Sequence, residues 1–218
     1  MRTPLLSLYR SLPALVLAVA LLAGCLSARA AADPNPGAAV AAAPAAAVPS
    51  APLAPHPITP ESVPPIEVTP PVRINCGAAK KLVDSAGHVW FPDQGYSDGN
   101  PYEVSDAPVA NTADPAIFRT ERYSMASYRF GVPNGRYTVR LLFAEVYTGI
   151  TGPGDRVFSF NVQGHEFKDF DIWQKAGGPD RAYVQSVDVE VTNGILSISF
   201  TPGVENPKIN GIEILPRP

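Results

Sequence analysis

Residues 134–147 read NGRYTVRLLFAEVY and carry the clearest strand pattern in the chain. Polar side chains alternate there with four apolar ones, which are Tyr137, Val139, Leu141 and Phe143. A period of two is typical of a strand with one buried face. The other face also becomes apolar toward the end, at Leu142 and Ala144. This change predicts a strand at the centre of a sandwich.

Two Asn-Gly pairs separate runs of the same alternating kind. The pair at 134–135 follows a run that contains Tyr128 and Phe130, and the pair at 193–194 lies between the runs 187–191 and 196–200. Because Asn-Gly is typical of tight turns, we expect two β-hairpins here. Many short strands without a long helical period predict an all-β fold, an antiparallel β-sandwich over residues 72–216.

The N-terminus has the pattern of a secretory signal. An apolar run at 12–22 is too short to span a bilayer, and it ends in Leu22-Ala23-Gly24-Cys25. These four residues resemble the bacterial lipobox. We therefore expect residues 1–24 to be a lipoprotein signal peptide and Cys25 to carry a lipid that anchors the protein to a membrane. The alternative is an ordinary secretory signal that is cut near residues 28–30.

The lipobox also predicts a location. Lipidation of Cys25 places the protein in the cell envelope, and Leu26, where an Asp would indicate retention at an inner membrane, favours the outer membrane of a cell with two membranes. Between the signal peptide and the sandwich, residues 25–71 are rich in Ala and Pro, and no aromatic residue occurs between Tyr9 and Trp90. This composition predicts a disordered tether with polyproline II character.

Charge and spacing exclude several other functions. The net charge is −3 and there is no basic cluster, so no nucleic-acid partner is expected. The histidines, His56, His88 and His165, lie too far apart for a metal site, and no cofactor motif occurs. Once Cys25 is lipidated, Cys76 has no cysteine partner, and its strand context predicts a buried thiol.

Aromatic side chains in polar, Gly-rich loops are candidates for ligand contact. Tyr147 leaves the central strand into such a loop at 148–154, and residues 84–116 form another that holds Trp90, Tyr96 and Tyr102. A phenol at the exit of a strand is well placed to meet a ligand. The alternative for the second loop is that it folds back over the core and buries its rings.

Six segments, in order, resemble the malectin family of carbohydrate-binding domains and together cover about residues 72–215. They are Ile74-Asn75-Cys76-Gly77, Thr120-Glu121-Arg122-Tyr123, Leu142-Phe143-Ala144-Glu145-Val146-Tyr147, Gly154-Asp155-Arg156-Val157-Phe158, Asp169-Phe170-Asp171-Ile172 and residues 206–214. The resemblance implies a jelly-roll-like, galactose-binding-like sandwich. It also implies a non-catalytic, lectin-like module whose loop-lined cleft binds glucose-type di- or oligosaccharides.

The same resemblance implies the binding residues. Tyr123 and Tyr147 end two of the matching segments, and Glu205 takes the place of an acidic residue before Asn-Pro-Lys. A third tyrosine belongs to the loop-rich segment, where Tyr96 and Tyr102 both qualify. Thr148 stands where the family has an aromatic side chain, so one stacking surface for a diglucose ligand is missing.

Two other functions are open at this stage. A scaffold could bind a protein partner through the same aromatic loops. A glycoside hydrolase would need two carboxylates that flank one bond. Its candidates carry no local signature, and they are Glu145, Asp155, Asp169, Asp171 and Glu205.

Overall fold

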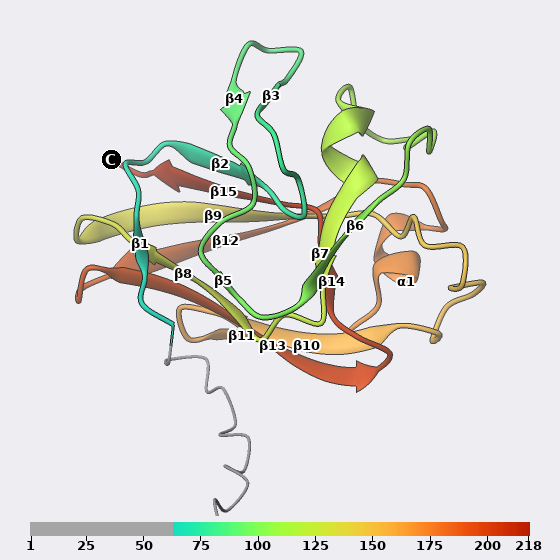
Figure 1. Ribbon diagram of the computed structural model, residues 1–218. Helices are drawn as coiled ribbons and strands as arrows, with labels where there is room; N and C mark the ends of the chain where they lie inside the picture. Colours follow the sequence, from blue (N-terminus) through green and yellow to red (C-terminus); the bar gives the residue numbers. More distant parts are fainter. Residues whose placement is uncertain (1–62) are drawn as a thin grey trace, which may run out of the picture. The chain divides into compact units, whose positions relative to one another are not determined.

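A computed structural model describes residues 63–218, which form two packed β-sheets with two smaller sheets beside them (Figure 1). The larger sheet has the order β1-β8-β13-β10-β11, and β5 also pairs with β8. Its strands are β1 (Ile66–Glu67), β5 (Tyr96–Ser97), β8 (Ser127–Gly131), β10 (Val157–Val162), β11 (His165–Phe170) and β13 (Ile195–Val204). The four-stranded sheet has the order β12-β9-β15-β2, with β2 (Val72–Asn75), β9 (Gly135–Phe143), β12 (Tyr183–Val191) and β15 (Gly211–Pro216).

Strand β9 occupies the centre of the four-stranded sheet, as the alternation predicts. Val139 lies opposite Val187 of β12 on one side and Ile214 of β15 on the other. All pairs in both large sheets are antiparallel except that of β1 with β8. The predicted all-β antiparallel sandwich is therefore confirmed.

Aromatic side chains fill the space between the two large sheets. The ring of Phe143 in β9 lies 5.7 Å from that of Phe160 and 4.9 Å from that of Phe170, centroid to centroid. Phe158 joins the same cluster at 6.3 Å from Phe143. Truncating a buried phenylalanine costs about 3–5 kcal/mol, so this cluster is a principal source of stability.

A second apolar cluster covers the outer face of the four-stranded sheet at the end of β9. Leu142, Ala144 and Val146 pack there against Trp90 and against the 3-10 helix η1 (Pro115–Arg119). The loop-rich segment thus folds back over the sheet, which explains why both faces of this strand are apolar. Trp90 belongs to this cluster, and its indole Nε1–H donates to Asp84 Oδ2 at 3.1 Å.

The two Asn-Gly turns are not hairpins, and that prediction is wrong. Strands β8 and β9 lie in different sheets, as do β12 and β13, so each turn carries the chain across the core. The two turns contact each other, because the Gly194 N–H donates to Asn134 Oδ1 at 2.7 Å. Crossing between sheets lets the apolar sides of both strands face the same core. By contrast, the turn at Gln163 and Gly164 does join a true hairpin, β10 and β11.

The ordered sheet begins before the predicted boundary at Val72. Ile66 of β1 lies opposite Phe130, and Ile66 and Val68 pack against the core. Strand β1 has only two residues and lies between two pairs of prolines, so it is too short to show the alternation of polar and apolar side chains by which a strand is predicted. The expected signal peptide, Cys25 and most of the expected tether lie outside the described residues.

Residues 63–218 contain one cysteine and only short helices. Cys76 is buried and free, and burial raises the pKa of its thiol well above the ordinary value, as expected of an inert structural cysteine. Within this range, no helix has the length and apolar character needed to cross a bilayer.

Candidate functional site

A cavity of about 310 Å³ lies beside the small three-stranded sheet β14-β7-β6. This sheet consists of β6 (Asn100–Glu103), β7 (Thr120–Tyr123) and β14 (Lys208–Ile209). The cavity combines three phenol rings with two carboxylates, a guanidinium group and an amide. Its lining residues are Tyr102, Glu121, Tyr123, Tyr147, Arg156, Glu205 and Asn206.

The strand period of β7 and β6 places three of these side chains on one face. Glu121 and Tyr123 are two residues apart, so they project to the same side of β7. Tyr102 of β6 lies directly opposite Glu121 in the register. Arg122 projects to the other side, where its Nε–H donates to Asp93 Oδ2 at 2.6 Å.

Tyr147 lines the cavity from the loop that follows β9. Its side chain is 44% exposed. Its ring meets that of Tyr102 edge to face, with the centroids 5.8 Å apart and the planes at 89°. The Tyr147 N–H donates to Glu145 Oε1 at 3.2 Å, which ties the loop to the strand end. The two phenols therefore make a corner of one ring face and one ring edge.

Glu205 and Asn206 form the turn that follows β13. Glu205 has a φ of 59°, and its Oε2 accepts a hydrogen bond from the Asn206 N–H at 2.9 Å. The same oxygen accepts from Asn206 Nδ2 at 3.3 Å. The side chain is 48% exposed, and no described residue donates to Oε1, so this oxygen is open to a ligand. The nearest cation is Arg156, whose Nη1 lies 4.0 Å from Glu205 Oε2.

Two ion pairs lie at the cavity, and each has one member in its lining. The Lys208 side chain is fully buried, and its ammonium donates to Glu121 Oε2 and to the Ala144 carbonyl. Arg156 donates from Nε to Glu145 Oε2 at 2.9 Å and from Nη1 to the Asn206 carbonyl at 2.6 Å. Burial raises the pKa of Glu121 above its ordinary value, and the charge of Lys208 offsets only part of that rise.

This arrangement suits a neutral molecule that is rich in hydroxyl groups. Lys208 and Arg156 face three carboxylates, Glu121, Glu145 and Glu205, so one negative charge is left in excess. An anionic ligand would meet that charge unfavourably. A sugar presents an apolar C–H face to aromatic rings and hydroxyl groups to a carboxylate, and the cavity provides partners for both.

The structure brings together four of the five binding residues suggested by the sequence. Tyr102, Tyr123, Tyr147 and Glu205 line this cavity, whereas Tyr96 does not. Tyr96 belongs to β5, which pairs with β8 in the larger sheet, and its ring lies 3.3 Å from the Arg122 guanidinium carbon.

The turn between β5 and β6 explains this separation of the two tyrosines. Asp98 and Gly99 both have a positive φ, 63° and 79°, and the chain leaves the larger sheet at this point. It then joins β7, so Tyr102 lies on the cavity side of β7 while Tyr96 lies on the Arg122 side. Of the two tyrosines, Tyr102 lines the cavity and Tyr96 does not.

Sequence reasoning assigned no role to Glu121, Arg156 or Asn206. Glu121 could have been found, because it is two residues before Tyr123 in a strand and must share its face. Arg156 and Asn206 carry no comparable local signal. They reach the cavity through contacts between segments 50 residues apart.

The carboxylates proposed for a hydrolase are mostly committed to structural hydrogen bonds. Asp155 accepts from the backbone and hydroxyl of Thr151, which lowers its pKa. Asp171 caps the helix α1 (Ile172–Ala176) and accepts from the Gly154 N–H at 2.7 Å. In the part of the chain that the structure describes, no three His, Cys, Asp or Glu side chains are grouped as metal ligands would be.

Comparisons with known proteins give one consistent result. A family model described as the malectin domain matches residues 71–212. Malectin-A of Xenopus laevis is 31% identical over 123 residues, which cover 49% of this chain and 44% of that protein. Human malectin is 30% identical over 123 residues, covering 49% and 41%. The chain thus spans less than half the length of these relatives.

Solved structures show the same fold. A β-glucuronidase from Bacteroides uniformis superimposes with a TM-score of 0.61 and 22% identity, over 67% of this chain and 18% of that one. The ANX1 ectodomain from Arabidopsis thaliana gives a TM-score of 0.57 and 19% identity, over 66% and 47%. At these identities, the likeness concerns the sandwich alone.

Proposed function

This chain belongs to the malectin domain family, and from that premise we propose that it is a lectin-like module that binds glucose-type di- or oligosaccharides without cleaving them. The malectin domain is a carbohydrate-binding, non-catalytic module. To this family function the proposal adds the type of sugar and the place in the cell where the module acts.

The observation that carries the proposal is the convergence of four side chains on one cavity. Tyr102, Tyr123, Tyr147 and Glu205 come from four separate parts of the chain, yet they line one cavity of about 310 Å³. Ring faces, a half-exposed carboxylate and paired charges beneath them are what recognition of a neutral sugar requires. The volume is at the small end of ligand sites, which favours one or two sugar units there.

The proposal places this module on the cell envelope. Cys25 would carry a lipid anchor in the membrane, the outer one where a cell has two, and residues 25–71 would link the anchor to the binding domain. A lectin held this way would act on glycans close to the surface of its own cell. These statements rest on the signal-like N-terminus, which lies outside the described residues.

The test is a titration of the full chain with a panel of glucose disaccharides that differ in linkage and anomer, followed by calorimetry. We expect Tyr102→Ala to weaken binding of the best disaccharide by about fivefold, since a ring contact contributes about 1 kcal/mol. Tyr96→Ala is the matched control, because Tyr96 is a tyrosine of the same segment outside the cavity, and it should bind normally.

Three outcomes would contradict this proposal. The panel could show no binding, as expected of a scaffold that binds proteins. Reducing ends could be released, as expected of a hydrolase. Equal losses in Tyr96→Ala and Tyr102→Ala would mean that the cavity described above is not the binding site.

A further inference from the structure

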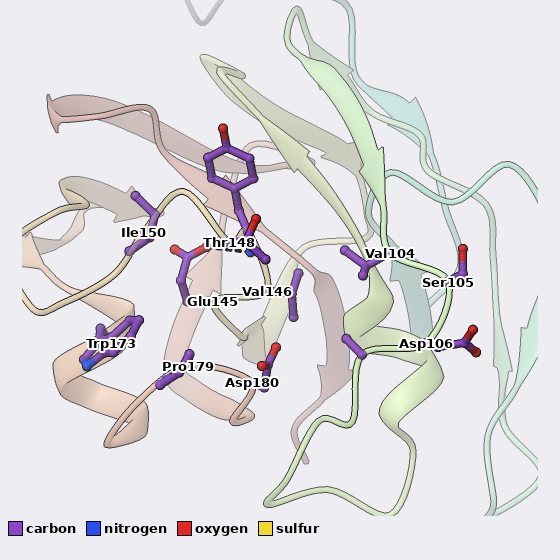
Figure 2. A pocket seen from close by; sticks show the side chains of 12 residues that line it. Val104, Ser105, Asp106, Glu145, Val146, Thr148, Ile150, Trp173, Pro179 and Asp180 are labelled. Carbon is purple, nitrogen blue, oxygen red and sulfur yellow. Dashed lines mark hydrogen bonds between the residues drawn. The ribbon is translucent and has the colours of Figure 1, made fainter. Parts of the chain in front are cut away.

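A second and larger hollow, of about 660 Å³, lies next to the first (Figure 2). Tyr147 lines both hollows, so the two share this residue. In Figure 2, Val104 and Asp106, which follow β6, lie on one side of this hollow, and Trp173 and Pro179 lie on the other. The hollow is thus walled by the exits of β6 and β9 and by α1.

Its surface pairs an indole ring with aliphatic side chains. Trp173 is half-buried on α1, and Ile150 lies near it on the same side (Figure 2). Val104 and Val146 add apolar surface. Thr148 stands directly after Tyr147 and is small and exposed, so it leaves the hollow open at the side of the Tyr147 ring.

Three polar groups that line the hollow have no hydrogen-bond partner among the described residues. Among residues 63–218, the structure shows no hydrogen bond to the carboxylates of Asp106 and Asp180 or to the Trp173 indole N–H. No lysine or arginine lines the hollow. Two carboxylates without a cation favour hydroxyl donors over an anionic ligand.

Backbone hydrogen bonds connect the segments that line the hollow to the strand end beside the first cavity. The Asp180 N–H donates to the Glu145 carbonyl at 2.9 Å, and the Ala110 N–H donates to the Asp180 carbonyl at 2.8 Å. Asp171 caps the start of α1, and Gly177 ends it with a φ of 77°. The backbone that carries Trp173 is therefore tied at both ends of α1 and, through Asp180, to the strand end that carries Tyr147.

We propose that this hollow is a second sugar subsite, which receives further units of the same neutral oligosaccharide whose end occupies the first cavity. Trp173 would stack on a sugar ring, and Asp106 and Asp180 would accept its hydroxyl hydrogen bonds. The inference rests on the proposed function and adds that the preferred ligand is a chain longer than a disaccharide.

The experiment compares a glucose disaccharide with the hexasaccharide of the same linkage, using the best linkage from the panel and calorimetry on the full chain. The wild type should bind the hexasaccharide several-fold more tightly. Trp173→Ala should lower the affinity for the hexasaccharide by roughly threefold to tenfold and leave that for the disaccharide within twofold. Trp173→Phe should retain most of the gain.

Gln174→Ala is the matched control, because Gln174 is exposed on the same helix and does not line the hollow. Thermal unfolding of each variant checks that α1 remains folded. Equal affinity of the wild type for both sugars, or an equal loss for both in Trp173→Ala, would overturn the second subsite and leave the first intact. If neither sugar binds, the proposed function fails as well.

Discussion

The position of the Tyr147 ring depends on the residue two places further along the chain. Gly149 lies so close beneath it that a Cβ there would be 2.4 Å from the ring atom Cε1. Since Gly149 does not have a positive φ, its backbone would accept alanine, and the ring would have to move instead. The exposed Gly149 therefore determines where the Tyr147 ring can lie, and Tyr147 lines both hollows.

We expect Gly149→Ala to weaken binding of both the disaccharide and the hexasaccharide by about threefold to tenfold, because Tyr147 leaves its place in each hollow. The free energy of unfolding should change by less than about 0.5 kcal/mol, since the site is at the surface. Gly152→Ala is the control, because the nearest atom to its added Cβ is 4.0 Å away. Calorimetry and urea denaturation would measure the two effects, and unaltered sugar binding in Gly149→Ala would contradict this account.

At the scale of elements, one ion pair joins three strands below the cavity. Lys208 of β14 donates to Glu121 of β7 and to the Ala144 carbonyl just beyond β9. Both charged side chains are buried. Removing one member of such a pair leaves the other charge in the interior without compensation, which costs far more than removing both.

Lys208→Met should therefore destabilise the domain by about 3–5 kcal/mol at neutral pH. Without Lys208, the pKa of Glu121 should rise further above its ordinary value of 4.5. A carboxyl with a higher pKa in the folded chain stabilises the fold below pH 4.5, and this contribution is lost as the pH rises through the folded value. Relative to the wild type, the variant should thus regain stability on acidification.

The double variant Glu121→Gln, Lys208→Met tests the same pair without a buried charge. Its loss of stability should be smaller than that of Lys208→Met, and the difference from the wild type should no longer depend on pH in this way. Denaturant unfolding between about pH 5 and pH 8 measures both. If Lys208→Met loses the same amount of stability at every pH, the unpaired Glu121 carboxylate is not the cause of that loss.

Local sequence patterns predicted where the strands lie better than they predicted which strands pair with one another. The alternation at 135–143 correctly places β9, and the double apolar face near Leu142 correctly indicates a covered strand. An Asn-Gly pair fixes only the backbone of a turn, so it cannot tell whether the next strand joins the same sheet or crosses the core. The residues that decide this, such as Phe143 against Phe160, are distant in the sequence.

For the whole molecule, the site could be predicted only in part. Tyr123, Tyr147 and Glu205 were suggested by their family resemblance, because no spacing in the chain reveals that they meet. Tyr102 could not be separated from Tyr96 without the turn that moves the chain between sheets. The buried pair of Lys208 with Glu121 was missed for the same reason, since 87 residues separate its members.

The lipid anchor and the sugar-binding site should work independently of each other. If Cys25 is lipidated, a palmitate analogue fed to cells that express the full chain should label the wild type and not Cys25→Ser. The variant should also move from the membrane fraction to the soluble one. Its affinity for sugars should be unchanged, because the cavity is built from residues between Tyr102 and Lys208. Equal labelling of both proteins would refute the anchor while leaving the binding site as described, and a change in sugar affinity would mean that the N-terminal residues take part in the site.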